Sequence, residues 1–338
     1  MKTTLKDIAE YVGVTPQLVS FYLNHPETTR VAKETRGRID EAVKRLDYHP
    51  NSVARALCTG RTKTIGLVMG GLTERKRGCY IHALMNEAKK YGYYLLTAIT
   101  NYDQKEEQEI LEYMMGRQVD GILYTLYLSP GARICQRLHK TGFPILLHAP
   151  QANQDFNTID YDCTRAVEDA LRAFLERGAR EILYLGAPND GEYRNLCELR
   201  GKEPFSLLFR PLPPEPGSFE LAVAEVLKKR PSAIFTVNVM FLQELLDRIN
   251  ECAPEYRPVC VTVYSLPFDW IRNDRVIGVV HRFYRERVES EIRRMLEIIE
   301  HPEEPPQKLV LPTEYVSAEQ LEAIRMQQLN DPYYKQFK

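Results

Sequence analysis

Residues 4 to 24 read TLKDIAEYVGVTPQLVSFYLN, and this stretch constrains the fold more than any other part of the chain. Apolar residues recur at helical spacing over residues 5–12, which predicts a short helix with one buried face. Thr4 and Asp7 form a capping-box pattern at its start, and Gly13 favours a sharp turn at its end.

A second helix is expected directly after this turn. Thr15 is a suitable N-cap, and Pro16 occupies the first helical position, where its missing N–H is harmless. We expect Val19 and Leu23 to face inward. The residues left to face outward are Gln17, Ser20, Phe21 and Asn24. Amide and hydroxyl groups near the N-terminus of an exposed helix suit base edges and phosphates, so the pattern favours a DNA-binding helix-turn-helix over an ordinary helical hairpin.

A third helix is expected from about Lys33 to Leu46, with Ile39, Ala42 and Val43 on its apolar face. Residues 1–63 hold 11 Lys and Arg against 7 Asp and Glu, a net charge of +4. The rest of the chain holds 34 against 39, a net charge of −5. A basic head on an acidic body is the distribution that phosphate contact requires of the head.

The seven cysteines are odd in number, scattered and never spaced as CxxC. This argues for a reducing compartment and against a zinc site or a disulfide framework. No apolar run approaches the ~18 residues of a membrane span, and Lys6, Asp7 and Glu10 interrupt any signal-peptide core. We therefore expect a cytoplasmic protein with no membrane segment, metal or cofactor.

From residue 64 onward, short apolar runs alternate with amphipathic segments, which predicts parallel sheets covered by helices. Such sheets bind ligands beyond the carboxyl ends of their strands. The expected strands are Ile65–Met69, Tyr94–Ile99, Gly121–Leu126, Ile145–His148, Glu181–Leu185, Ala233–Val237 and Val259–Val263. The expected helices are Ala83–Tyr91, Gln104–Met115 and Cys163–Arg177, and residues 211–217 form a proline-rich loop.

The sequence contains none of the catalytic motifs GxSxG, HExxH, GxGxxG or P-loop. Asp160 and Asp162 are paired acids, and His148 and His281 lie near expected strand ends. Each is more typical of a solvated loop acid or a satisfied histidine than of a catalyst. The sequence therefore does not indicate an enzyme.

Residues 48–66, YHPNSVARALCTGRTKTIG, complete a family pattern that begins in the head. Together the two segments resemble the family of the lac and galactose repressors. The resemblance is dense over residues 4–67 and thinner but traceable to about Ser317. It rests on Lys6 to Ala9, Gly13-Val14-Thr15, Val19-Ser20, Leu23-Asn24, Tyr48-x-Pro50-Asn51-x-x-Ala54-Arg55-x-Leu57 and Thr59 to Gly66.

The resemblance implies an all-α three-helix head with a hinge helix, followed by an α/β core with two lobes like those of a periplasmic sugar-binding protein. The implied divisions are a helix-turn-helix head at 1–50, a hinge helix and linker at 51–63, and an effector-binding and dimerisation core at 64–338. Lobe N would comprise about 64–160 plus 282–312, and lobe C about 161–281 plus 313–338, with crossings near Tyr161, His281 and Pro312.

The resemblance also implies roles in DNA recognition. Base-reading positions fall on Pro16, Gln17 and Phe21, and a Gln amide can bond adenine. The family usually has Arg at the position of Phe21, which would read guanine, whereas phenylalanine favours a thymine methyl group. Phosphate and backbone contacts fall on Thr4, Thr15, Ser20, Asn24, Tyr48 and Asn51. In the implied hinge helix, Ala54 matches the family pattern and Leu57 takes the position that wedges between base steps of the minor groove.

The resemblance weakens at the effector pocket. Residues 74–77 read ERKR where the family has stacking aromatics, and the stretch 263–266 lacks an acid that typically grips sugar hydroxyls. The cleft is therefore expected to be more positive than in sugar-binding relatives, which favours a carboxylate or phosphate ligand, unless both bases point to solvent. The implied effector residues are Lys76, Arg77, Asp162, Arg194, Asn238, Tyr264 and His281.

The sequence thus predicts a homodimeric transcriptional regulator, expected to be a repressor of carbohydrate metabolism, that binds near-palindromic operator DNA at the nucleoid and responds to a small-molecule effector. A second hypothesis is a DNA-binding regulator whose core answers to a protein partner or to no ligand. A third is a two-lobe solute-binding protein without DNA function. Leu321, Ile324 and Leu329 are expected to make at most a short amphipathic turn, and residues 331–338 carry no heptad, which favours a dimer over a tetramer.

Overall fold

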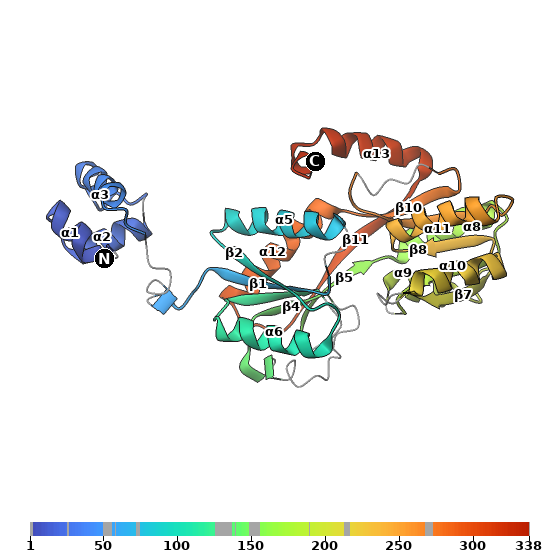
Figure 1. Cartoon of the computed structure of the whole chain (residues 1–338), viewed down its shortest axis with the longest axis horizontal. Helices are drawn as coiled ribbons and strands as arrows, with labels where there is room; N and C mark the ends of the chain where they lie inside the picture. The colour runs from blue at the N-terminus through green and yellow to red at the C-terminus, as the bar shows by residue number, and fades with distance from the viewer. Residues whose placement is uncertain are drawn as a thin grey trace. The chain divides into compact units, whose positions relative to one another are not determined.

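In the computed structural model the chain divides into two compact units, Met1–Thr62 and Lys63–Lys338, which we call the head and the core (Figure 1). None of the described helices is long and apolar enough to cross a membrane. The structure describes the chain except residues 1–2, 26, 50–55, 58, 72–74, 126–136, 139, 149–155, 189, 213–216, 268–272 and 338, and except the side chains of residues 75 and 76.

The head contains the helices α1 (Leu5–Val12), α2 (Pro16–Asn24) and α3 (Lys33–Arg45). The Thr4–Asp7 capping box is present at the start of α1, and Gly13 ends that helix in a left-handed conformation with φ 76°. Thr15 caps α2 by accepting a hydrogen bond from the Leu18 backbone N–H. The predicted helix signals are therefore confirmed.

A small apolar core joins the three helices of the head. Its buried members are Ile8, Ala9, Val12, Val19, Tyr22, Val31, Ile39, Ala42 and Tyr48. Val19 faces inward as predicted, whereas Leu23 is only partly buried. Tyr22 takes an inward place that the sequence reading did not assign, because its hydroxyl donates a 2.8 Å hydrogen bond to Asp40 on α3 while its ring packs in the core.

Lobe N of the core is built on parallel strands in the order β2-β1-β3-β4-β5. Helices α5 and α12 pack on one face of these strands and α6 on the other, as Figure 1 shows. The strands are β1 (Thr64–Met69), β2 (Tyr94–Ile99), β3 (Gly121–Thr125), β4 (Ile145–Leu147) and β5 (Asn157–Asp162). The helices are α5 (Arg75–Lys90), α6 (Gln104–Gly116) and α12 (Tyr284–Glu300).

Lobe C repeats this construction with parallel strands in the order β10-β9-β8-β6-β7. Helices α8 and α9 contribute to the apolar cluster on one face, and α10 and α11 to the cluster on the other. The strands are β6 (Glu181–Gly186), β7 (Ser206–Pro211), β8 (Ala233–Thr236), β9 (Val259–Tyr264) and β10 (Val276–Arg282). The helices are α8 (Thr164–Glu176), α9 (Gly191–Leu199), α10 (Ser218–Lys229) and α11 (Val239–Cys252).

Strand β11 (Lys308–Ser317) connects the two lobes. Its residues 308–312 pair in parallel with β5 of lobe N, and its residues 313–317 pair antiparallel with β10 of lobe C. The chain also passes between the lobes after β5, which leads to α8, and after β10, which leads to α12. Polar side chains near these three passages therefore lie close to both lobes.

Some elements differ from the sequence-based expectation. Helix α5 begins eight residues earlier than predicted, and the strands β5, β7, β10 and β11 were not among those expected. Strand β11 is exposed along much of its length and contains Pro312, so it lacks a continuous apolar run. The expectation of at most a short turn near Leu321 was wrong, because α13 (Ala318–Asn330) is a full helix with a capping box at its start, and α14 (Pro332–Lys335) follows it.

Candidate functional site

The outward face of α2 carries the polar groups expected to meet DNA. Gln17 and Asn24 are exposed, while Pro16 and Ser20 are half-buried. The side-chain amide of Asn24 donates to the Ser20 carbonyl over 2.9 Å. Thr4 is exposed at the start of α1, where its hydroxyl donates to Asp7. The head thus presents short hydrogen-bond donors and acceptors on the exposed face of one helix. Contacts with bases and phosphates require such groups.

Phe21 has a neighbour that sequence reasoning missed. The imidazole of His25 stacks on the Phe21 ring, with centroids 4.9 Å apart and planes 25° apart. His25 Nδ1 also lies 3.1 Å from the Phe21 carbonyl oxygen. The spacing of four residues in the sequence is the signal that could have revealed this pair.

The remaining predicted DNA contacts fall at the end of the head. Tyr48 is buried at 8% exposure in the apolar core of the head. Leu57 is 81% exposed, an unusual state for a leucine in a folded unit. Asn51 and Ala54 lie outside the described residues.

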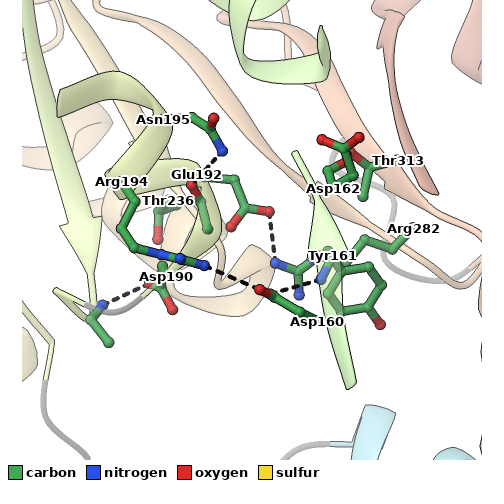
Figure 2. A network of polar contacts seen from close by, with 12 residues as sticks. Asp160, Tyr161, Asp162, Asp190, Glu192, Arg194, Asn195, Thr236, Arg282 and Thr313 are labelled. Atoms are coloured by element: carbon green, nitrogen blue, oxygen red, sulfur yellow. Dashed lines mark hydrogen bonds and ion pairs between the residues drawn. The ribbon is translucent and has the colours of Figure 1, made fainter. Parts of the chain in front are cut away.

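An ion pair near the interlobe passages joins β10 and α9 of lobe C (Figure 2). The guanidinium of Arg282, at the end of β10, contacts the fully buried Glu192 of α9 at 2.6 Å. It also lies over the ring of Tyr161 on β5, 4.4 Å from the ring centroid. Burial opposes the charge of Arg282, but the carboxylate of Glu192 raises the pKa of the guanidinium well above its usual value.

A second ionic group shares this region. Asp160 on β5 is buried, and its Oδ2 contacts Lys308 Nζ at 2.7 Å and Arg194 Nη2 at 3.4 Å. Its Oδ1 accepts the backbone N–H of Tyr161 at 2.8 Å. Because Arg194 belongs to α9 of lobe C and Asp160 to β5, this contact joins the two lobes. Figure 2 shows both ionic groups side by side.

Several buried polar atoms of this group lack a hydrogen-bond partner within the described part of the chain. They are Glu192 Oε2, Arg194 Nε and Arg282 Nε. Leaving such groups unsatisfied costs roughly 1–3 kcal/mol each, so these atoms are available for a bound polar molecule. We call Asp160, Tyr161, Glu192, Arg194 and Arg282 the interlobe polar group.

A second buried network lies within lobe N. Glu291 on α12 is fully buried, and its carboxylate contacts Arg287 at 2.6 Å and the Tyr80 hydroxyl at 2.6 Å. His148 Nε2 lies 2.7 Å from the same carboxylate. Burial alone would raise the pKa of Glu291, but Arg287 and His148 together lower it to about 2. These contacts favour the ionised form of the carboxylate in the lobe interior.

Of the predicted effector residues whose side chains the structure describes, Arg194 belongs to the interlobe polar group. Asp162 is exposed near Thr313, whose hydroxyl donates to the Asp162 carbonyl. The Asn238 side chain caps α11 by accepting from the Phe241 N–H. Arg194 pairs with Asp160 instead.

Three other predicted effector residues pack against aromatic rings. The rings of Tyr264 and His281 lie 5.6 Å apart, and the Tyr264 hydroxyl donates to Gln328. Burial lowers the pKa of His281, although Glu314 opposes this. Arg77 lies over the Tyr102 ring at 5.9 Å. The side chain of Lys76 is outside the described part.

The sequence reasoning named neither Glu192 nor Arg282, and it considered Asp160 only as a loop acid. A glutamate in a helix and an arginine after a strand carry no local signal of mutual contact, since they are 90 residues apart in the chain. In the described residues, no group of three His, Cys, Asp or Glu side chains is placed to hold a metal ion.

The fold defines a class of protein: a helix-turn-helix head joined to a two-lobed core like that of periplasmic binding proteins. The family described as "Bacterial regulatory proteins, lacI family" matches residues 4–51. The catabolite repressor/activator of Escherichia coli strain K12 is 30% identical over 260 residues, covering 72% of this chain and 76% of the relative. The chain belongs to the lacI family, whose matched members are named as transcriptional regulators rather than enzymes.

Other relatives match over a shorter span. The transcriptional regulator PtxS of Pseudomonas aeruginosa is 31% identical over 191 residues, which cover 56% of this chain and 55% of the relative. The match thus spans about half the length of that protein. Among solved structures, the lac repressor dimer bound to operator and the anti-inducer ONPF aligns with a TM-score of 0.75 at 18% identity, covering 94% of this chain and 98% of that one. That likeness shows the shared fold.

Proposed function

We propose that the protein is a homodimeric repressor that binds a near-palindromic operator on chromosomal DNA in the cytoplasm and is controlled by a small molecule between the lobes of its core. The observation that carries the DNA-binding part is the exposed polar face of α2 on a capped helix-turn-helix. Membership of the lacI family supports it. Under this proposal, the net charge of +4 in residues 1–63 favours DNA through its phosphates.

In the proposed complex, Pro16, Gln17 and Phe21 meet base edges. Positioning contacts to phosphates or sugars come from Thr4, Thr15, Ser20, Asn24, Tyr48 and Asn51. Changing Phe21 to Arg should shift the selected half-site toward one that contains guanine, because Arg bonds guanine with two donors. In vitro selection of operators with both proteins tests this placement. Identical base preferences for the two proteins would contradict it.

Ala54 and Leu57 belong to the proposed hinge helix, and the 81% exposure of Leu57 supports a role in which this side chain finds its partner on DNA. Leu57→Ala should weaken operator binding while leaving binding to random DNA nearly unchanged, since the latter depends on phosphate charge. Titrations of both DNAs at one salt concentration measure this difference. Equal losses on both DNAs would exclude the wedge.

We propose a dimer rather than a tetramer. Leu321 on α13 is 1% exposed and packs against β10 and β11 of the same chain, so this leucine already has its partners within the chain. A helix used in this way offers no free heptad seam for a second dimer. Light scattering at micromolar concentration should give the mass of two chains, and the mass of four would contradict the proposal.

For the effector we propose a sugar or an anionic metabolite bound at the interlobe polar group, with Lys76, Arg77, Asp162, Asn238, Tyr264 and His281 contributing at its edges. The solved relatives include a Pseudomonas putida Cra regulator in complex with fructose 1-phosphate, with a TM-score of 0.64 at 15% identity. The buried Nε atoms of Arg194 and Arg282 support an anion, because charge-assisted hydrogen bonds to Arg are among the strongest.

A thermal-shift screen of sugars, sugar phosphates and organic acids tests the effector proposal. An anion should raise the melting temperature, and Arg77→Ala and Arg194→Met should each reduce that shift. Stabilisation by neutral sugars alone, unaffected by either change, would exclude an anionic effector.

A second candidate is a regulator whose core answers to a protein partner or to no ligand. It is favoured by the Arg282–Glu192 and Arg194–Asp160 contacts, which already pair the ionic groups between the lobes. Operator binding that no compound of the screen alters would support it.

A further inference from the structure

Gln17, Phe21 and His25 are spaced four residues apart, so their side chains share one face of α2 and its C-cap. Gln17 and His25 are exposed, and Phe21 between them is half-buried. The stacked Phe21 ring holds the imidazole of His25 in place beside the proposed base-reading positions. An exposed polar ring held in this way presents a defined edge to solvent.

The contact of His25 with the backbone determines which edge it presents. A carbonyl oxygen can only accept, so Nδ1 of His25 carries the hydrogen that is donated to the Phe21 carbonyl at 3.1 Å. In a neutral imidazole the other nitrogen, Nε2, is then an acceptor. An acceptor in the major groove matches the amino group of adenine or cytosine and is mismatched with the acceptors of guanine.

We infer that His25 is a further specificity-determining residue of operator recognition, with Nε2 accepting a hydrogen bond from an adenine or cytosine amino group. This inference rests on the proposed DNA-binding function and adds one read base pair to each half-site. It also gives Phe21 a second role as the support of the His25 ring.

Selection of operators from a randomised library with the full chain tests this inference. His25→Ala should relax one base pair per half-site and lower affinity for the best operator by roughly 5- to 100-fold. His25→Gln, which keeps an acceptor, should retain part of the preference. Glu41→Ala, an exposed change on α3, serves as the control.

The outcomes separate this inference from the proposed function. If the wild-type protein selects no sequence, the proposed DNA-binding function fails. If the wild type selects an operator and His25→Ala selects the same one at every position, the role of His25 is overturned.

An independent observation concerns the C-terminal 20 described residues, which attach to both lobes. On lobe C, Leu321 of α13 packs with Tyr264, Val279 and Val316. The Tyr264 hydroxyl donates to the buried Gln328 amide oxygen over 2.6 Å. Helix α13 is thus anchored to the sheet of lobe C at both of its ends.

The segment that follows is anchored to lobe N. Tyr334 and Phe337 are buried in the apolar cluster that contains residues of α5 and α12. Phe337 meets the ring of His82 edge-on at 6.0 Å, and the Asn86 amide donates to Gln336 over 2.6 Å. In Figure 1 the red C-terminal segment accordingly returns toward α5.

A rotation of the lobes about their three passages that separates the surfaces carrying these anchors changes the distance between them. We propose that residues 318–337 form a strap that limits lobe rotation, with the anchor at Tyr334 and Phe337 as the part that must release. The lobe N anchor is carried by the four-residue helix α14 and the residues after it, whereas the lobe C anchor is carried by the 13-residue helix α13, so release at the lobe N end unfolds less regular structure.

Spin labels carried by unnatural residues at Glu109 of lobe N and Lys202 of lobe C, both exposed, measure the lobe separation in the full chain. The wild type should give one narrow distance distribution. Tyr334→Ala with Phe337→Ala should add a second distance population. Lys335→Ala, an exposed change on the same short helix, should leave the distribution unchanged.

Hydrogen exchange of residues 331–337 shows in parallel whether the anchor has been released. Faster exchange there with an unchanged distance distribution would overturn the strap, as would fast exchange of these residues in the wild type. If the double variant does not fold, His82→Ala can replace it, because this change removes only the edge contact with the Phe337 ring. The distance distribution and the hydrogen exchange are then measured in the same way.

Discussion

The head and the core differ in how far apart in the sequence their contacting polar residues lie. In the head, the hydrogen bond between Tyr22 and Asp40 joins residues 18 apart, and the face of α2 is a single run of nine residues. In the core, the Tyr80–Glu291 hydrogen bond joins residues 211 apart. A surface that reads DNA can therefore be recognised in a contiguous segment, whereas a site between lobes requires the whole fold.

The largest expected effect tests the core. Glu291→Gln should lower its free energy of unfolding by about 3–5 kcal/mol, because the fully buried carboxylate is lost and the half-buried Arg287 loses its counter-charge. Urea unfolding of the full chain, resolved by region with hydrogen exchange, measures this loss and should show α1–α3 unchanged. Glu289→Gln on the same helix, whose partner Arg285 is exposed, should cost at most about 1 kcal/mol. Equal losses for both variants would remove the distinction between buried and exposed pairs.

The next effect tests the head. Gln17→Ala should weaken binding to the best operator by ~1–3 kcal/mol and relax the choice at one base pair. Because Gln17 is exposed, the stability of the head should not change. Titration against the operator and its single-base variants gives both quantities. A uniform loss over all the variants would assign Gln17 to backbone contact instead.

A smaller effect concerns local stability within the head. Thr15→Ala removes the N-cap of α2 and should destabilise the head by about 1 kcal/mol. Faster hydrogen exchange in α1–α3 without a change in the core would show that the two units respond separately. Lys6→Ala, an exposed change within α1, is the matched control. If exchange in the core rises equally, the separation of the units is contradicted.

The smallest effect is the pH dependence carried by His281. Burial lowers its pKa below the usual 6.5, while Glu314 and Glu286 oppose this shift. The unfolded chain therefore binds a proton that the folded core resists, so this contribution to stability is present above pH 6.5 and is lost as the pH falls below it. His281→Gln should flatten the stability curve between about pH 7 and pH 5. If the slope of stability against pH is unchanged in this variant, groups other than His281 determine the pH dependence.

The helices of the head could be predicted from the sequence because the signals that define them are local. The cap residues Thr4 and Thr15 and the left-handed Gly13 act on their immediate neighbours, and all three have the predicted geometry. Most buried strands were also recognised, since a short apolar run is a local property. The inward place of Tyr22 was missed because its hydroxyl is satisfied by an acid on another helix.

The strands near the interlobe passages could not be predicted, because the contacts that stabilise them come from residues far apart in the sequence. Strand β5 carries Asp160 and Asp162, and acids in a strand lower its apparent apolar character. The buried Asp160 is tolerated because Arg194 and Lys308 approach it from other elements of the core, and Asp162 is exposed. Such compensation is invisible in a linear reading.

The capped helices of the head and the alternation of strands and helices in the core follow from the backbone and side-chain preferences of nearby residues, so both could be predicted from the sequence. The pairing of Glu192 with Arg282 and the return of Phe337 to the surface of α5 depend on the folded core. These contacts form where chain segments far apart in sequence are brought together by burial, and their partners were therefore set by the packing of the whole core.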